Sequence, residues 1–238
     1  MRREADIIPV MDIMEGQVVH GVAGQRDAYK PIESRIVKGS DPLDVANAIK
    51  KTFEVETLYI ADLDAITGDG DNFDIIAEII KSSDLEVLLD GGLASLDDLE
   101  PLFKTGVHHV VVATETIESM EELARIFEHH GESLVGSLDL MNGQTMSACS
   151  EFADKSPKEM AGILEDLGVE KLIVLELSLV GSGKGPVHDA LLEICENSSM
   201  EIIAGGGVRN RDDLRRLFDL GVRSALVATA LHCGSILP

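Results

Sequence analysis

The chain has 238 residues, 45% of them hydrophobic, and a formal net charge of −23. This length suits a single α/β-barrel domain spanning residues 1–238, and the charge argues against nucleic acid, whose phosphates would be repelled. No apolar run reaches membrane-spanning length and residues 1–6 lack the apolar core of a signal peptide, so no membrane partner is expected. The scattered cysteines lack metal-ligand spacing and indicate a reducing, cytoplasmic compartment.

Apolar runs alternate with helical patterns along the whole chain. We expect strands at residues 6–11, 57–61, 86–89, 109–112, 134–138, 172–175, 202–204 and 225–227. We expect helices at residues 41–49, 72–80, 96–103, 118–130, 157–167, 187–195 and from 210 onward, with a loop rich in Asp and Gly at 62–71. This alternation predicts an α/β fold of parallel βαβ units closed into a (βα)8 TIM barrel.

The segment after the eighth strand is too short for a full helix. The last helix of the barrel is therefore expected to be short or missing. One hypothesis is that a second copy of the chain covers this part of the wall, which would make the protein a homo-oligomer.

The two halves of the sequence resemble each other. One strand–glycine–helix–strand pattern occurs in Val87–Ile117 and again in Ile202–Leu231. The corresponding pairs are Gly91 with Gly206, Gly92 with Gly207, Asp12 with Asp139, and Asp62 with Glu176. We interpret the chain as a duplicated half-barrel, with halves at about residues 1–118 and 119–238.

Two aspartates close apolar strands on opposite sides of the expected barrel mouth, Asp12 and Asp139. Active sites of such barrels form at the C-terminal ends of the strands. Two carboxyl groups across one cavity can be driven to different pKa values and act as acid and base, the alternative being that each caps a turn. Arg26 lies in the loop after the first strand, where a lid over substrate would lie.

Each glycine pair lies between a strand and the start of a helix. Backbone N–H groups in this setting form a ready anion site, and the two sites face each other across the barrel, which suits a ligand with two anionic ends. The acidic residues at 62–74 lack the pattern of a calcium loop. We expect no metal and no other cofactor.

Over its whole length the chain resembles the histidine-biosynthesis barrel family, which includes ProFAR isomerase. The motifs that carry this resemblance are IIPVMDIMEGQVVHGVAG, LYIADLDA, DGGLASLDDLEPLFKTGVHHVVVAT, SLDLMNGQ and AGGGVRNRDDLRRLFDLGVRSALVATAL. The resemblance implies an Amadori-type isomerase of a phosphorylated sugar conjugate, with Asp12 as base and Asp139 as acid. It also implies two phosphate clamps, the first of Gly91, Gly92 and Thr114 and the second of Gly206, Gly207, Ala228 and Thr229. The expected substrate-binding residues are His20, Arg26, Asp62, Glu176 and Ser182.

Several residues depart from the isomerase pattern. Leu175 stands where a Thr assists the catalytic pair, Leu179-Val180 replace Arg-Asp, and His20 replaces a substrate-binding Arg. Asp90 replaces a glycine of the first clamp and adds negative charge, so phosphate is expected at the second clamp first. The alternatives are a paralogue outside histidine synthesis, either a lyase or condensing enzyme in one-carbon cofactor metabolism or a barrel that binds a phospholigand without catalysis.

Overall fold

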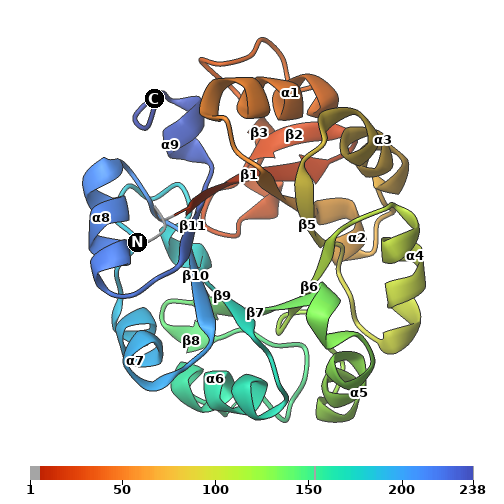
Figure 1. The fold of residues 1–238 in the computed structure, drawn as a ribbon, viewed down its shortest axis with the longest axis vertical. Coiled ribbons are helices and arrows are strands. Elements are labelled where there is room, and N and C mark those ends of the chain that lie inside the picture. Colours follow the sequence, from red (N-terminus) through yellow and green to blue (C-terminus); the bar gives the residue numbers. More distant parts are fainter. Residues whose placement is uncertain (1–5, 153, 238) are drawn as a thin grey trace.

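A closed barrel of parallel strands forms the centre of the computed structural model, which describes residues 6–152 and 154–237. The barrel strands, in their order around the ring, are β1 (Asp6–Met14), β4 (Thr57–Asp62), β5 (Glu86–Asp90), β6 (His109–Ala113), β7 (Leu134–Met141), β9 (Lys171–Glu176), β10 (Glu201–Gly205) and β11 (Ser224–Val227). The ring closes because β11 pairs in parallel with β1, with Asp6 opposite Ser224 (Figure 1). The predicted TIM barrel and its eight strands are confirmed.

Helices surround the barrel on its outer side (Figure 1). They are α1 (Pro42–Phe53), α2 (Leu63–Thr67), α3 (Phe73–Ser83), α4 (Leu99–Lys104), α5 (Met120–His130), α6 (Pro157–Asp166), α7 (Asp189–Asn197), α8 (Arg211–Asp219) and α9 (Thr229–His232). The start of α1 follows from local chemistry, since Asp41 accepts hydrogen bonds from the Leu43 and Asp44 N–H groups and Pro42 needs no such bond. The last helix, α9, has four residues, as the short C-terminal segment predicts.

Two parts of the chain differ from the sequence prediction. The expected loop at 62–71 contains α2, whose first turn is capped by the Asp62 carboxylate and which ends at Gly68 with φ of 77°. A helix of five residues is too short to show a helical period, so the sequence pattern hides it. The expected helix at 96–103 begins as a 3-10 turn, Leu96–Asp98, before α4 continues it.

Short antiparallel strands extend the ends of two barrel strands. β2 (Gln17–His20) turns back on β1, and β3 (Lys30–Pro31) pairs with β2. On the other side of the barrel, β8 (Gln144–Thr145) turns back on β7. The two hairpins thus occupy corresponding places after β1 and β7.

The core has an outer and an inner layer. The outer layer packs the strands against the helices, and the inner layer fills the barrel with side chains such as Tyr59, Val111, Ile173 and Leu226. Each fully buried aliphatic side chain of this kind stabilises the fold by roughly 1.5–3 kcal/mol. The inner layer fills the barrel itself and leaves no room for a ligand inside it. A ligand site therefore lies above this layer, at the C-terminal ends of the strands.

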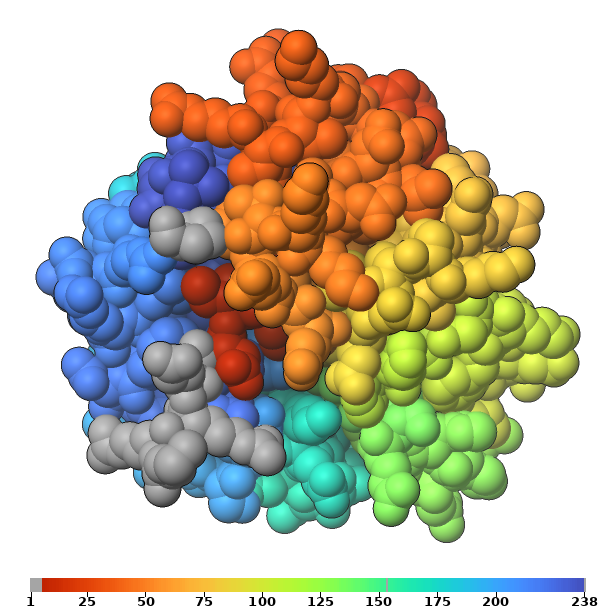
Figure 2. All heavy atoms as spheres, turned by 45° about the horizontal axis from the view of Figure 1, so that its top comes forward, coloured from red at the N-terminus to blue at the C-terminus, as the bar shows by residue number. Residues whose placement is uncertain are grey.

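The end of the chain lies beside an early segment. The blue C-terminal residues lie against the orange segment that follows β3 (Figure 2), and the Arg35 N–H donates to the His232 carbonyl oxygen over 2.9 Å. This contact places α9 next to the loops that follow β1. Within the described ranges, no helix is long and apolar enough to cross a membrane.

Candidate functional site

A cavity of about 390 Å³ opens at the C-terminal ends of the barrel strands. Its carboxyl groups come from three strands and one loop: Asp12 from β1, Asp90 from β5, Asp139 from β7 and Glu115 from the segment after β6. Asp12 and Asp139, which the sequence analysis places on opposite sides of the barrel mouth, therefore share one cavity. Arg26, in the segment between β2 and β3, also lines the cavity.

Asp12 lies under the loop that follows β2. A Cβ atom on Gly21 would lie 2.7 Å from Asp12 Oδ2, so only glycine lets this loop approach the carboxyl group so closely. Burial raises the pKa of Asp12 to about 6, and the nearby Arg26 guanidinium opposes part of that rise. The carboxyl group is thus poised to gain or lose a proton close to neutral pH.

Asp139 is more deeply buried, with 3% of its surface exposed. Its Oδ1 accepts a hydrogen bond from the Ser137 hydroxyl over 3.0 Å, whereas its Oδ2 has no partner among the described residues. Burial, with the nearby carboxyl groups of Glu115 and Asp90, holds its pKa well above the ordinary aspartate value. Burial and these negative neighbours therefore favour the protonated form of Asp139, which is the form that a general acid needs.

Asp90 and Glu115 form a second acidic group beside Asp139. Asp90 is 7% exposed and accepts a hydrogen bond from the Tyr59 hydroxyl over 3.1 Å. Burial, and then the Glu115 carboxylate, raise the pKa of Asp90 to about 7. Glu115 makes an ion pair of 2.6 Å with Arg26.

Sequence reasoning did not assign Glu115 or Tyr59 to the site and treated Asp90 only as a departure from a motif. Asp90 ends β5, and Asp12 and Asp139 lie close to the C-terminal ends of β1 and β7, so strand position could have identified Asp90. Glu115 directly follows the expected clamp residue Thr114. Tyr59 could not be identified in this way, because its inward direction depends on the register of the barrel.

The residues expected to form the second phosphate clamp all border the cavity: Gly206, Gly207, Ala228 and Thr229. Gly206 and Gly207 adopt positive φ angles of 96° and 78°. A Cβ atom on Gly206 would lie 2.5 Å from the Glu176 carbonyl oxygen, and one on Gly207 would lie 2.6 Å from the Gly185 carbonyl oxygen. These positions require glycine for both conformation and space.

Arg209 and His232 line the same end of the cavity. The Arg209 guanidinium is held by two hydrogen bonds of 2.7 Å to the buried Asp213 carboxylate. Burial, with the nearby His20, lowers the pKa of His232 to about 4, so its ring is neutral at neutral pH.

The residues expected to form the first clamp do not border the cavity. Among the described residues that line it, Gly91, Gly92 and Thr114 are absent. A Cβ atom on Gly92 would lie 2.7 Å from the Ala65 carbonyl oxygen and from Ile66 Cα, because α2 packs directly on this glycine. Gly91 lies against the Leu102 side chain in the same way. Thr114 is 1% exposed, and its hydroxyl oxygen accepts a hydrogen bond from the Asp139 N–H.

The expected substrate-binding residues divide into two groups. His20 and Arg26 line the cavity. Asp62 instead accepts hydrogen bonds from the Asn72 N–H over 2.6 Å and the Asn72 side-chain amide over 2.7 Å, in addition to capping α2. These hydrogen bonds give Asp62 a structural role, because they hold the loop between α2 and α3 in place.

Glu176 and Ser182 also make structural contacts. The Glu176 carboxylate accepts from the N–H groups of Asn142 and Gly143, in the turn between β7 and β8. The exposed Ser182 hydroxyl donates to the Leu179 carbonyl oxygen over 2.8 Å.

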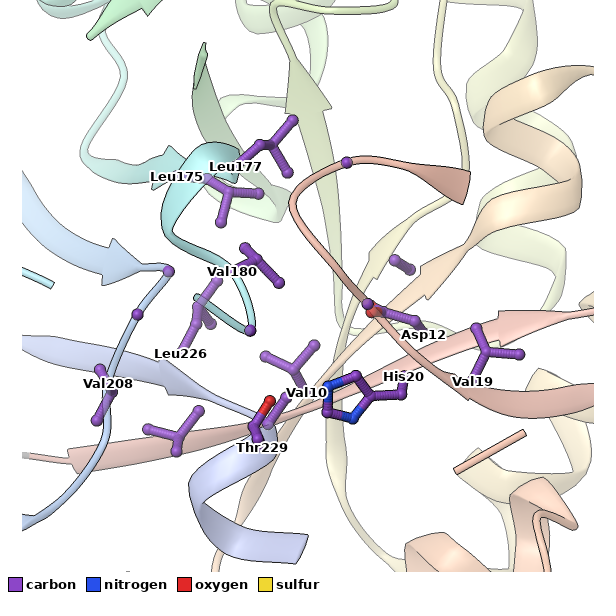
Figure 3. A pocket seen from close by; sticks show the side chains of 18 of the residues that line it. Val10, Asp12, Val19, His20, Leu175, Leu177, Val180, Val208, Leu226 and Thr229 are labelled. Atoms are coloured by element: carbon purple, nitrogen blue, oxygen red, sulfur yellow. The ribbon is translucent and has the colours of Figure 1, made fainter. Parts of the chain in front are cut away.

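One wall of the cavity is apolar. Figure 3 shows Leu175, Leu177 and Val180, from β9 and the loop after it, across from Asp12 and His20. Leu175 and Val180 stand where the isomerase pattern has Thr and the Asp of Arg-Asp, so the side chains of this wall offer packing and no hydrogen bonds. Within the described part of the chain, no group of three or more His, Cys, Asp or Glu side chains is placed to hold a metal ion.

Comparison with known proteins finds relatives that match almost the whole chain. The chain is 37% identical over 230 residues to an uncharacterised protein of Methanocaldococcus jannaschii, covering 96% of this chain and 93% of that protein. It is 31% identical over 232 residues to an imidazole-4-carboxamide isomerase of Methanosphaera stadtmanae, whose named substrate has two phosphoribosyl groups, covering 97% and 95%. It is 30% identical over 234 residues to phosphoribosyl isomerase A of Streptomyces coelicolor, covering 95% and 92%. Residues 6–237 match the model for the family described as histidine biosynthesis protein, and the chain belongs to that family.

Proposed function

We propose that the protein is an aldose–ketose isomerase of the Amadori type that acts on a phosphorylated sugar conjugate. The observation that carries the proposal is the pair Asp12 and Asp139, two carboxyl groups near the C-terminal ends of β1 and β7 that share one cavity and whose pKa values burial raises. A carboxylic acid and a carboxylate base facing one cavity are what this reaction needs. The names of the isomerases among its relatives support the same reaction class.

Asp139 acts first, as the acid. Its proton goes to the ring oxygen of the aminoaldose as the bond between C1 and that oxygen breaks, which leaves a protonated imine at C1. Asp12, with a pKa of about 6 and so roughly 90% ionised at pH 7, then removes the proton from C2. The electron pair of that C–H bond moves toward the imine nitrogen and forms an enol-amine, which tautomerises to the aminoketose.

The phosphate of the substrate is assigned to the glycine end of the cavity. Gly206, Gly207 and Thr229 border it there, and Arg209 adds a positive charge. Backbone amides beside glycines of positive φ suit phosphate oxygens, which take several donors at once. His20 and Arg26 are assigned to the substrate from the β1–β2 side.

The test is turnover by Asp12→Asn and Asp139→Asn. Each substitution keeps the shape of the side chain and removes its proton chemistry, so turnover of aminoaldose phosphates, ProFAR among them, should fall by roughly 10³-fold or more. Asp97→Asn is the matched control, since Asp97 is an exposed aspartate outside the cavity. Circular dichroism should show all three variants folded, and an active Asp12→Asn or Asp139→Asn variant would refute the mechanism.

A lyase or condensing enzyme, acting outside histidine synthesis, is the second candidate. The apolar wall favours it, because Leu175 and Val180 stand there in place of the Thr and Asp of the isomerase pattern. Mass spectrometry of the product separates the two candidates, since an isomerase leaves the mass of its substrate unchanged. Binding of a phosphorylated ligand with no product of either kind would instead indicate a non-catalytic barrel.

A further inference from the structure

The two ends of the cavity differ in what they offer a ligand. At the β5–β6 end, α2 packs on Gly92 so closely that the Ala65 carbonyl oxygen and Ile66 Cα would lie 2.7 Å from an added Cβ atom. Thr114 is buried, and its hydroxyl oxygen is already taken by the Asp139 N–H. Gly91, Gly92 and Thr114 thus do not border the cavity in which a phosphate of the substrate would lie.

Carboxyl groups stand at this end of the cavity instead. Asp90, Glu115 and Asp139 line it together, and the Glu115 carboxylate raises the pKa of both Asp90 and Asp139. Arg26 is already paired with Glu115, at 2.6 Å. A phosphate entering here would meet further negative charge in a buried setting, whereas a cationic group would allow Asp90 to ionise and bind it.

Hydrogen-bond donors gather at the opposite, β10–β11 end. His232 is 3% exposed and lines the cavity, and its Nδ1 lies 3.0 Å from the Ser34 hydroxyl oxygen. Where the Ser34 hydroxyl donates to Nδ1, the neutral ring carries its proton on Nε2 and can donate it to a ligand. His232 Nε2 has no partner within the described ranges and is buried. A buried ring nitrogen of this kind calls for a hydrogen bond with a ligand.

Building on the proposed isomerase function, we propose that the substrate is asymmetric, with one phosphate and one amino group. The phosphate lies at the β10–β11 end, against Gly206, Gly207 and Thr229. The amino group lies at the β5–β6 end, against Asp90 and Glu115. The substrate is thus a monophosphorylated amino compound rather than a bisphosphate.

Calorimetric titration with two matched pairs of sugar phosphates tests this assignment. Glucosamine 6-phosphate differs from glucose 6-phosphate by an amino group, and it should bind at least about tenfold more tightly. Fructose 1,6-bisphosphate differs from fructose 6-phosphate by a second phosphate, which should improve binding by no more than about threefold. A bisphosphate that binds tenfold or more tightly than its monophosphate, or an amino sugar that binds no better than its hydroxyl partner, would overturn the proposal.

Asp90→Asn tests the amino end by itself. Asparagine keeps the shape and an acceptor for the Tyr59 hydroxyl, but it cannot ionise, so the preference for glucosamine 6-phosphate over glucose 6-phosphate should fall by about fivefold or more. Affinity for glucose 6-phosphate should be unchanged, and Asp97→Asn should preserve both affinities. An undiminished amino preference in folded Asp90→Asn would remove this residue from the ligand site.

Turnover of ProFAR and of amino sugar phosphates distinguishes the proposal of an asymmetric substrate from the proposal of an isomerase. Efficient isomerisation of ProFAR, which carries a phosphate at each end, would support the isomerase and overturn the asymmetric substrate. The expected pattern of binding, without isomerisation of any amino sugar phosphate, would support the asymmetric ligand and overturn the isomerase.

Discussion

Asp90→Asn should make the protein more stable, and increasingly so as the pH rises. An aspartate has a pKa of 3.8 when it is free in the unfolded chain, whereas burial raises the pKa of Asp90 to about 7 in the fold. A carboxyl group whose folded pKa lies above its unfolded value binds its proton more tightly in the fold. Its contribution to stability therefore decreases as the pH rises from 3.8 to about 7 and is constant above that range.

The two pKa values give the size of the effect. With 3.8 and about 7, the folded state is disfavoured by about 1–2 kcal/mol at pH 5 and by about 4 kcal/mol at pH 8. Asparagine has no charge to bury, and its amide oxygen can still accept the Tyr59 hydrogen bond. The stabilisation by Asp90→Asn should therefore grow by about 2–3 kcal/mol between pH 5 and pH 8.

Urea unfolding at pH 5 and pH 8 measures this difference. The midpoint should shift to higher urea in Asp90→Asn with an unchanged slope, and the shift should be larger at pH 8. Asp97→Asn is the control, because an exposed aspartate should leave the midpoint within about 0.5 kcal/mol of the wild type at both values of pH. A shift of equal size at both values, or a loss of stability at pH 8, would refute the assignment of a buried, protonated Asp90.

Two further predictions concern the strand ends. Gly206→Ala should destabilise the fold by about 2–4 kcal/mol, measured by urea unfolding, because the new Cβ atom would lie 2.5 Å from the Glu176 carbonyl oxygen at a φ of 96°; a neutral substitution would show that this loop is not fixed. The rate of isomerisation, as kcat/KM, should rise with pH through about 6 as Asp12 ionises and fall only where Asp139 loses its proton, well above the ordinary aspartate range. A rate that is flat between pH 5 and pH 7 would contradict the role of Asp12 as base.

The barrel was predictable because its signals are local and repeated. Each of the eight strands is a short apolar run between helical patterns. Buried parallel strands typically appear in a sequence as such runs. The pair Asp12 and Asp139 was predictable for a related reason, since an acidic residue at the end of a buried strand must lie at the barrel mouth. What this rule could not supply is which strand-end acids stay available to a ligand.

Asp62 and Asp139 show why that information is missing from the sequence. Asp62 ends β4, Asp139 lies close to the end of β7, and both are buried. Asp62 is surrounded by the N–H groups of a loop and a short helix, including those of Ala65 and Asn72, so its oxygens are satisfied by the protein. Asp139 Oδ2 has no such donor among the described residues. The difference depends on loop conformations that bring distant N–H groups together, and no periodic pattern encodes them.

The two glycine pairs make the same point about anion sites. In sequence, Gly91-Gly92 and Gly206-Gly207 both lie between a strand and a helix. In the structure, Gly92 is covered by α2, whereas Gly206 and Gly207 border the cavity. Glycine is required in both places because backbone approaches it closely, and only the three-dimensional structure reveals whether a free surface remains beside it.

Asp90 is expected to affect both the stability of the protein and the binding of the amino ligand. If its carboxyl group is buried to bind an amino group, one substitution should both stabilise the empty protein and weaken the amino ligand. A variant that stabilises the protein and keeps the amino preference would mean that Glu115 and Asp139 bind the ligand without Asp90. A variant that weakens binding of the amino ligand without stabilising the protein would mean that Asp90 is already ionised in the empty cavity. The Arg26 guanidinium, which lowers the pKa of Asp90, would then be the charge that offsets it. The two measurements together therefore identify the charge state in which this carboxyl group meets its ligand.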